Sequence, residues 1–372
     1  MSRRIVQFGT SRFLQAHADL FVHEARAAGQ TIGPITVVKT TAGGDRAGRV
    51  AAFARAEGFP VRIRGRRDGA LVDETIIVRS VDQAFDAKAD WPAVVDHFAK
   101  DAEVAMSNVG DRGYEIADED RAFDPASSKV PVSFPGKLLA LLGARHRAGG
   151  RSLLFLPTEL IASNGRVLSG VVAELARAWG MSAAFQEWLA GSVVFADGLV
   201  DRIVSEEIEP IGAVAEPYAL WAIRRGNFDP PFTHPAVTMT ENLEPFERLK
   251  LHILNLGHTV LAEEWIRRGR PANETVARFL GEAAITERLT EIYSDEVVLG
   301  FAAHGMKDAA AVYVQTTLER FRNPFLQHRI ADIANSHATK VARRIQAFMD
   351  WAHERDPSLR LPHLAEIALA YR

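Results

Sequence analysis

The sequence predicts an α/β domain followed by a mostly α-helical domain. Short apolar runs alternate with helical patterns from the start of the chain to about residue 205, the order of elements that builds a parallel sheet. Beyond about residue 241 almost every segment has the period of a helix. We therefore expect one domain over residues 1–240 and a second, all-helical domain over 241–372.

The first thirty residues predict a strand, a tight turn and a helix. The apolar run 4–8 ends at Gly9, and a helical pattern covers about 12–28. A pyrophosphate binds at the amino end of such a helix, so we expect a Rossmann-like dinucleotide-binding domain. The glycine fingerprint is weak, because Ser11 and Leu14 stand at the second and third glycine positions. The candidate cofactor-binding residues of this turn are Gly9, Thr10, Ser11 and Phe13.

The second predicted strand, 35–40, ends without the acidic residue that often binds the ribose hydroxyls of NAD. Lys39 and Arg46 stand near this end instead. Two cations here would suit the 2′-phosphate of NADP, so these residues leave NADP open beside NAD. A basic loop in solvent is an equally good interpretation of Lys39.

The remaining elements follow from the same patterns. We expect a hairpin over 57–65 and 75–81, strands from 104, at 153–157 and at 193–204 with a break at Gly198, and helices at 91–99, 137–147 and 166–178. The later helices are expected at 244–268, 272–293, 306–320, 324–350 and 361–371. Asn108 lies in the loop after the strand from 104, where ligands of parallel sheets bind, and is a further cofactor candidate.

One long helix, about 241–269, carries the residues best suited to chemistry. Asn242 is placed to cap it and Gly269 to end it. Lys250, Asn255 and His258 stand inside its apolar stripe, and at about 100° per residue they fan over roughly 140°. A lysine, an amide and an imidazole on the rim of an apolar face suit reactions of an alcohol or a carbonyl. The alternative is a solvated lysine, a loop-binding asparagine and a core histidine.

Composition excludes several classes of protein. A net charge of −3 gives no electrostatic reason to expect nucleic acid or an anionic membrane. The chain has no cysteine, which excludes disulfides, thiolate zinc sites and cysteine nucleophiles. The amino terminus leads into a strand without an apolar signal region, and no stretch has about 20 uninterrupted apolar residues. We expect a soluble cytoplasmic protein without a metal.

Several segments together resemble the long-chain polyol and sugar-acid dehydrogenases, also called the mannitol dehydrogenase family. Within this family they resemble the tagaturonate reductase (altronate oxidoreductase) branch most. They are IVQFGTSRFLQAH at 5–17, RIRG at 62–65, SNVGDRG at 107–113, PTELIASNG at 157–165, LVDRIV at 199–204, EPYALWAI at 216–223, ERLKLHILNLGHT at 247–259 and RFRNPFLQHRI at 320–330. The chain departs from the family at Ser11, which replaces a glycine, at Gln15, where arginine is usual, and at Thr158, where cysteine is common.

The resemblance implies zinc-independent hydride transfer between NAD(H) and a secondary alcohol of a sugar acid. It makes Lys250 the general acid and base, since desolvation on an apolar face disfavours the ammonium. Asn255 and Asn164 would hold the developing oxyanion, and His258 would fix the substrate or the lysine. Asn164 before Gly165 is also an ordinary turn residue.

The resemblance also implies substrate-binding groups. Asp201 would accept a hydrogen bond from a substrate hydroxyl, with an ion pair to Arg202 as the alternative. The substrate carboxylate suits an arginine or a lysine, and the candidates are Arg320, Arg322 and Lys340. We expect one of the two arginines to face the substrate and the other to make a structural contact.

Three alternatives remain open from the sequence. A polyol dehydrogenase of the mannitol or arabinitol kind would need hydroxyl-binding groups in place of cations. A polyol-phosphate dehydrogenase would use Lys340, Arg343 and Arg344 against a phosphate. A non-catalytic nucleotide-binding sensor would bind NADH without turning over any sugar acid.

Overall fold

The computed structural model describes residues 3–41, 47–110, 112–125, 127 and 129–371. The chain forms two compact units. The first contains Met1–Ile63, Glu74–Ala215 and Ala219–Leu243, and the second contains Arg64–Asp73, Glu216–Tyr218 and Glu244–Arg372. The helical unit thus includes two short segments that come from the first part of the sequence.

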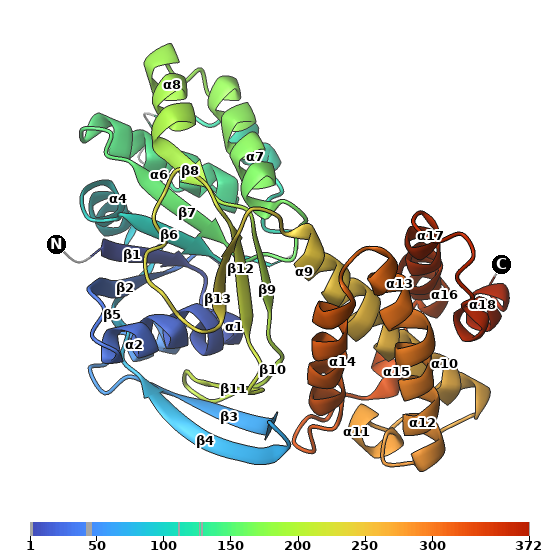
Figure 1. Ribbon diagram of the computed structural model, residues 1–372. Coiled ribbons are helices and arrows are strands. Elements are labelled where there is room, and N and C mark those ends of the chain that lie inside the picture. The colour runs from blue at the N-terminus through green and yellow to red at the C-terminus, as the bar shows by residue number, and fades with distance from the viewer. Residues whose placement is uncertain (1–2, 42–46, 111, 126, 128, 372) are drawn as a thin grey trace. The chain divides into compact units, whose positions relative to one another are not determined.

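The first unit is built on a six-stranded parallel sheet with the order β5–β2–β1–β6–β7–β8 (Figure 1). Its strands are β1 (Arg3–Phe8), β2 (Ile32–Lys39), β5 (Val81–Asp86), β6 (Val104–Ser107), β7 (Leu153–Pro157) and β8 (Val193–Phe195). The strand order reverses between β1 and β6, and ligands of such sheets bind beyond the carboxyl ends of the strands at this point. The predicted Rossmann-like architecture is confirmed.

The helices of this unit largely follow the predicted positions. The first is one continuous run made of α1 (Arg12–Leu14), a π-helical segment η1 (Gln15–Asp19) and α2 (Leu20–Ala27). The others are α4 (Trp91–Lys100), α6 (Phe134–Arg147) and α7 (Asn164–Ala178), together with three that the sequence patterns did not predict: α3 (Ala47–Phe53), α5 (Asp118–Arg121) and α8 (Ala183–Ser192). Residues of α4, α6, α7 and α8 share one buried apolar core with Phe8 and Phe155 of the sheet.

The hairpin is confirmed as β3 (Phe59–Arg67) and β4 (Ala70–Val78). Its two-residue turn is Asp68-Gly69, and both residues have positive φ, 54° and 78°. This is the turn whose backbone twist matches the twist of paired strands. The hairpin belongs to a four-stranded sheet of order β10–β11–β3–β4.

The strand predicted over 193–204 with a break at Gly198 is interrupted twice, and only the break next to Gly198 was predicted. The structure divides it into β8, β9 (Gly198–Asp201) and β10 (Val204–Glu207), and each belongs to a different sheet. The breaks are held by polar side chains with partners elsewhere. Asp197 accepts a hydrogen bond from the backbone N–H of Arg166 at 2.9 Å, and Arg202 donates to the carbonyl of Ala16 at 2.6 Å. These partners are distant in sequence, so apolar alternation could not reveal the breaks.

The segment from 213 to 240 also contains strands that the sequence patterns missed. They are β11 (Ala213–Ala215), β12 (Leu220–Arg224) and β13 (Val237–Thr240). The last two form a three-stranded sheet of order β13–β12–β9. Each has three to five residues, too few to display a clear alternation.

The second unit is predominantly helical, as predicted, although the expected helices are interrupted. After Glu244 its elements are α9 (Glu244–Leu249), η3 (Lys250–Asn255), α10 (Leu256–Arg267), α11 (Val276–Phe279), α12 (Ala283–Glu291), η4 (Ile292–Val297), α13 (Val298–Ala303), α14 (Lys307–Phe321), α15 (Ile330–Ile333), α16 (His337–Val341), η5 (Ala342–Gln346), α17 (Ala347–His353) and α18 (Pro362–Leu369). The helix expected over 324–350 begins only at Ile330 and is interrupted between Ile333 and His337, where Ser336 has φ +56°.

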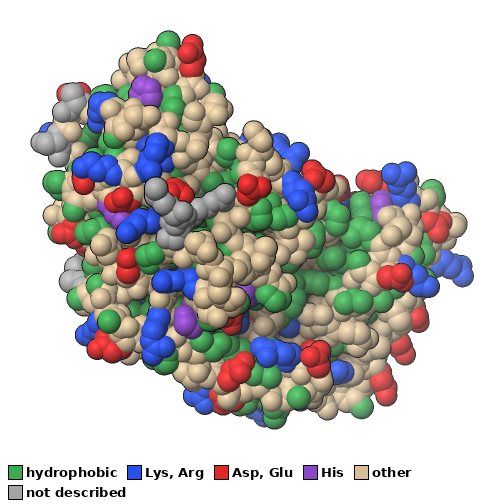
Figure 2. Space-filling view, turned by 60° about the vertical axis from the view of Figure 1, so that its left-hand side comes forward, with side chains coloured by type: hydrophobic (Ala, Val, Ile, Leu, Met, Phe, Trp, Pro, Cys, Tyr) green, Lys and Arg blue, Asp and Glu red, His purple; other side chains and the backbone are tan. Residues whose placement is uncertain are grey.

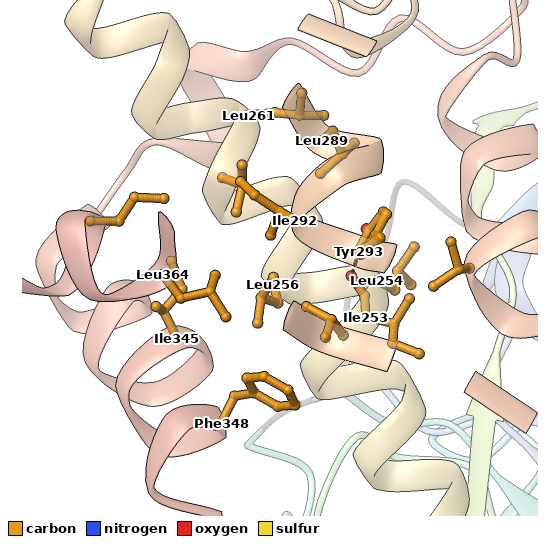
Figure 3. Packing of buried hydrophobic residues seen from close by; sticks show 14 of the residues in the cluster. Ile253, Leu254, Leu256, Leu261, Leu289, Ile292, Tyr293, Ile345, Phe348 and Leu364 are labelled. Atoms are coloured by element: carbon orange, nitrogen blue, oxygen red, sulfur yellow. Dashed lines mark hydrogen bonds between the residues drawn. The ribbon is translucent and has the colours of Figure 1, made fainter. Parts of the chain in front are cut away.

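The long helix predicted around Lys250 is the centre of this unit. It runs without a break through α9, η3 and α10 and ends where Gly269 takes φ +57°. Ile253, Leu254 and Leu256 enter the buried apolar cluster shown in Figure 3. Tyr293 and Phe348, from neighbouring helices, belong to the same cluster.

Gly257 is required by the packing of this helix. A Cβ atom there would lie 1.8 Å from the hydroxyl oxygen of Tyr293. Gly257→Ala should therefore lower the free energy of unfolding by about 1–3 kcal/mol through overpacking. Gly170→Ala in α7 is the matched control, because a Cβ there meets nothing within 4 Å. It should be neutral or stabilising by up to about 1 kcal/mol. Urea unfolding followed by circular dichroism measures both, and equal effects would contradict this account.

Candidate active site

The turn between β1 and α1 lies at the point where the strand order reverses. Gly9 has φ +116°, and a Cβ there would lie 2.5 Å from the carbonyl oxygen of Asn108. Only glycine permits this close approach of the turn to the loop after β6. Thr10 is buried, and its carbonyl oxygen accepts hydrogen bonds from Gln15 at 3.2 Å and Arg49 at 3.3 Å.

Ser11 and Asn108 join the two sides of this edge. The Ser11 hydroxyl caps the helix by accepting from the N–H of Leu14 at 3.3 Å, and it donates to Asn108 Oδ1 at 3.0 Å. Asn108 Nδ2 donates to the carbonyl and hydroxyl oxygens of Thr158 at 3.2 and 3.1 Å. The carboxyl ends of β1, β6 and β7 are therefore linked by side chains, with the amino end of a helix beside them. Phe13 is half-buried and stacks on His17, with ring centroids 4.7 Å apart.

Glu159 is an important residue of this edge that the sequence patterns did not single out. It is buried and accepts from Ser107 Oγ at 3.1 Å, Tyr114 Oη at 2.8 Å and the N–H of Val109 at 3.0 Å. Burial raises the pKa of its carboxyl group. It fixes the loop that carries Asn108. The only sequence signal was its position directly after an apolar strand.

A cavity of about 560 Å³ opens beside these strand ends. Its apolar wall is formed by Val109, Val130, Pro131, Val132 and Phe134. Thr40, Thr41 and Lys88, which follow β2 and β5, line it as well. An apolar slot for a base, next to a helix amino end for a pyrophosphate, fits a dinucleotide.

Lys39 does not lie in a solvated basic loop. Its side chain is 4% exposed, and its Nζ lies 2.6 Å from Asp86 Oδ2. The charge that would have suited a 2′-phosphate is already paired. Arg46, the second cation considered for that role, lies outside the described residues.

Asn164 has a structural role in this arrangement. Its Nδ2 donates to the carbonyls of Pro157 and Glu159, each at 3.1 Å, and its Oδ1 accepts from the N–H groups of Gly165 and Gly198 at 2.9 Å. Both amide hydrogens are used here, which favours the turn interpretation of Asn164. The expected role as an oxyanion donor stays a prediction. Asp201 is buried in β9, opposite Leu220 of β12.

In the second unit, Lys250 and Asn255 are the first and last residues of the π-helical segment η3. Both are half-buried. The expected arc of roughly 140° assumed α-helical geometry and is wrong here, because a turn closed by i→i+5 hydrogen bonds rotates less per residue. Residues five apart are then separated by only slightly more than one full turn. The segment thus brings Lys250 and Asn255 closer to a common line along the helix.

His258 is surrounded by cations and rings. It is 7% exposed, and its ring centroid lies 4.4 Å from that of Phe321 and 4.9 Å from that of His328. Burial, and then the charges of His328, Arg320, Arg344 and Lys340, lower its pKa well below the usual value. The imidazole is therefore neutral at pH 7 and serves as a hydrogen-bonding group rather than as a cation.

Lys340 and Arg344 lie near His258 on one helix. Lys340 Nζ donates to the carbonyl of Ile333 at 2.6 Å, and burial, followed by the charge of Arg344, lowers its pKa. Arg344 donates to the carbonyl of Asn255 and to the Thr259 hydroxyl, each at 3.2 Å. We call His258, His328, Lys340 and Arg344 the basic cluster.

Arg320 and Arg322 differ sharply. Arg320 is 5% exposed and forms a two-point ion pair with Glu216, at 2.8 and 3.0 Å, under the ring of Tyr218. Its guanidinium is committed to a buried carboxylate, so the structural role expected for one of the two arginines falls to Arg320. Arg322 is exposed at the end of α14.

In the described ranges the protein has neither a cluster of metal-binding side chains nor a helix that could cross a membrane. Over these residues, His, Asp and Glu side chains nowhere gather in a group of three or more that could hold a metal ion. None of the described helices has the length and apolar character needed to cross a membrane. On the face shown in Figure 2, cations and carboxylates are interspersed.

Breaking the Arg320–Glu216 pair should destabilise the protein strongly. Glu216→Gln leaves a buried guanidinium without its countercharge, which typically costs about 3–5 kcal/mol. Glu287→Gln, at an exposed position of α12, makes the same chemical change and should stay within about 0.5 kcal/mol of the parent. Chemical denaturation gives both values. If Glu216→Gln lowers the free energy of unfolding by less than about 1 kcal/mol, the Arg320–Glu216 pair does not stabilise the protein as proposed.

Comparison with known proteins agrees with these two units. The family model described as "Mannitol dehydrogenase Rossmann domain" matches residues 3–233, and "Mannitol dehydrogenase C-terminal domain" matches 242–371. The altronate oxidoreductase of Halalkalibacterium halodurans is 28% identical, over 100% of this chain and 76% of its own length. That of Bacillus subtilis is 25% identical, over 95% and 76%.

Two solved structures share the fold. A D-sorbitol dehydrogenase in substrate-free form has a TM-score of 0.81 at 20% identity, covering 100% of this chain and 80% of its own. A Pseudomonas fluorescens mannitol 2-dehydrogenase, in ternary complex with NAD and D-mannitol, has a TM-score of 0.72 at 17% identity, covering 100% and 78%. The family models and the altronate oxidoreductases confirm the resemblance inferred from the sequence motifs.

Proposed function

The chain belongs to the mannitol dehydrogenase family, and on this premise we propose that it transfers hydride between NAD(H) and a secondary alcohol of a sugar acid, of the altronate and tagaturonate kind. Family membership makes it an oxidoreductase that acts on CH–OH groups. The altronate oxidoreductases among its relatives support the sugar acid, and the sorbitol and mannitol enzymes share only the fold. The cytoplasmic location expected from the sequence stays a prediction.

The cofactor is proposed to bind at the carboxyl edge of the large sheet. Gly9, Thr10, Ser11 and Phe13 would meet the pyrophosphate side, and Asn108 the loop side. NAD, when bound, supplies the acceptor for a hydride from the carbinol carbon. The chain's own residues must then bind the substrate and handle the hydroxyl proton.

Lys250 is proposed as the group that takes this proton. In the oxidation direction the hydroxyl proton passes to the lysine amine as the C–O bond becomes a carbonyl, and in reduction the ammonium returns it. Asn255, on the same side of the π-helical segment, would donate an amide hydrogen bond to the oxygen while it carries negative charge. His258, neutral and one turn further, would bond a substrate hydroxyl. Asp201 is proposed to accept from another.

The basic cluster is the observation that favours a sugar acid over a neutral polyol. Lys340 and Arg344 both act on the electrostatic environment of His258, so a carboxylate bound near that ring gains their attraction. Arg322 stays a second candidate for the carboxylate. A neutral alditol has no charge to be attracted by Lys340 and Arg344, so these two cations would remain without a substrate counterion.

Lys250→Ala tests the mechanism. Turnover should fall by about 10²–10⁴-fold, the usual contribution of general acid–base catalysis, while the circular dichroism spectrum and the dissociation constant for NADH stay close to those of the parent. Lys307→Ala, which removes an exposed lysine at the start of α14, is the control and should leave turnover unchanged. Addition of a small primary amine should restore part of the lost activity. Parental turnover in Lys250→Ala would remove the lysine from the mechanism.

Lys340→Met tests the substrate class. It should raise KM for altronate by about 10-fold or more, as expected for the loss of a charge-assisted contact, and leave the weaker turnover of mannitol unaffected. Arg343→Met removes an exposed cation of the same helix and should change neither. A matched screen over aldonates, uronates, alditols and alditol phosphates completes the test. Preference for alditols, or insensitivity of altronate turnover to Lys340, would favour the polyol dehydrogenase instead.

A further inference from the structure

The end of β2 has an unusual charge arrangement. Where NAD-binding units often carry their own acid, this strand ends in Lys39. The acid comes from the neighbouring strand instead, because Asp86 of β5 is the register partner of Lys39 in the parallel pair. The two side chains meet at 2.6 Å.

The two partners are not equally accessible. The Lys39 side chain is 4% exposed and that of Asp86 is 23% exposed, so the ammonium lies inside and the carboxylate faces outward. Asp86 Oδ1 also accepts from the N–H of Lys88 at 2.8 Å, and the N–H of Asp86 donates to Asp90 Oδ2 at 2.9 Å. The loop after β5 therefore fixes the position of the carboxylate. Burial alone would raise the pKa of Asp86, but the hydrogen bonds from Lys39 and Lys88 lower it.

Residues next to Lys39 and Asp86 in the sequence line the cavity beside the strand ends. Thr40 and Thr41 directly follow Lys39, Lys88 closely follows Asp86, and all three line the cavity that has the apolar wall. If a base fills the apolar part and a pyrophosphate meets the turn at Gly9, the sugar between them passes the ends of β2 and β5. A partly exposed, ionised carboxylate can accept hydrogen bonds from two ribose hydroxyls and repels a 2′-phosphate.

We propose that Asp86, held by Lys39, is the group that binds the adenosine ribose of the cofactor and selects NAD over NADP. This inference rests on the proposed function only in its requirement for a dinucleotide. Lys39 cannot serve a 2′-phosphate in this arrangement, because its charge is turned to Asp86. Two cations that line the cavity are likewise engaged: Arg112 pairs with Glu115 at 2.6 Å, and Lys137 Nζ donates to the carbonyl of Val132.

The test measures binding directly, through the fluorescence of NADH and NADPH titrated into the full-length protein. The parent should bind NADH at least about 10-fold more tightly than NADPH. Asp86→Asn removes the repulsion and uncovers the Lys39 charge, so the ratio should shift toward NADPH by about 10-fold or more. Asp96→Asn, an exposed change of the same kind in α4, is the control and should leave the ratio unchanged.

A second variant guards against misfolding, since Asp86→Asn leaves a buried lysine without its partner. The double variant Lys39→Met/Asp86→Asn removes both charges and should bind the two cofactors with similar affinity.

Two results would overturn the inference: a parent that prefers NADPH, or an unchanged ratio in both Asp86 variants. A parent that binds neither nucleotide would refute the proposed cofactor itself. Selective NADH binding without turnover of sugar acids would refute only the proposed substrate.

Discussion

The hydrogen bonding of residues 250–255 is the constraint on which the helical unit depends. An i→i+5 turn has poorer geometry than an α-helical one and is retained mostly where it serves function. Here its carbonyls receive outside donors: Tyr293 donates to Ile253 at 2.9 Å, and Arg344 donates to Asn255 at 3.2 Å. The same Tyr293 occupies the space left by Gly257. The position of the candidate lysine and amide is therefore fixed by the apolar core behind them.

A similar dependence links the carboxyl edge of the large sheet to its core. The turn at Gly9 approaches the backbone of Asn108, and Glu159 collects three donors that hold the loop bearing Asn108. Burial of that carboxyl group is tolerated because each donor compensates the lost hydration. In both units, groups that would face ligand are positioned by buried polar partners supplied from distant parts of the sequence.

This explains what the sequence could and could not predict. Periodicity located the strands of the large sheet and the helix around Lys250, because both depend on local burial patterns. It failed over 193–204, where Asp197 and Arg202 redirect the chain through bonds to distant residues. Periodicity also could not show that Arg320 forms a buried ion pair while Arg322 is exposed. Nor could it show the four hydrogen bonds of the Asn164 amide group, because spacing along the chain does not reveal hydrogen-bond partners. The ion pair of Lys39 could not be predicted for the same reason, because its partner Asp86 lies 47 residues later in the sequence.

The weak glycine fingerprint now has a physical explanation. A glycine at position 11 would allow the closest approach of a pyrophosphate, but it would supply no side chain. Ser11 uses its hydroxyl to cap the helix and to bond Asn108, and Asn108 in turn bonds Thr158, the residue that stands where cysteine is common in the family. Gln15, in place of the usual arginine, accepts from the N–H of Gly212 at 2.7 Å. Ser11 and Thr158, two of the positions at which the chain departs from the family, are thus connected through hydrogen bonds to Asn108. A motif search that scores each position separately loses this information, although these hydrogen bonds preserve the rigid edge that a dinucleotide requires.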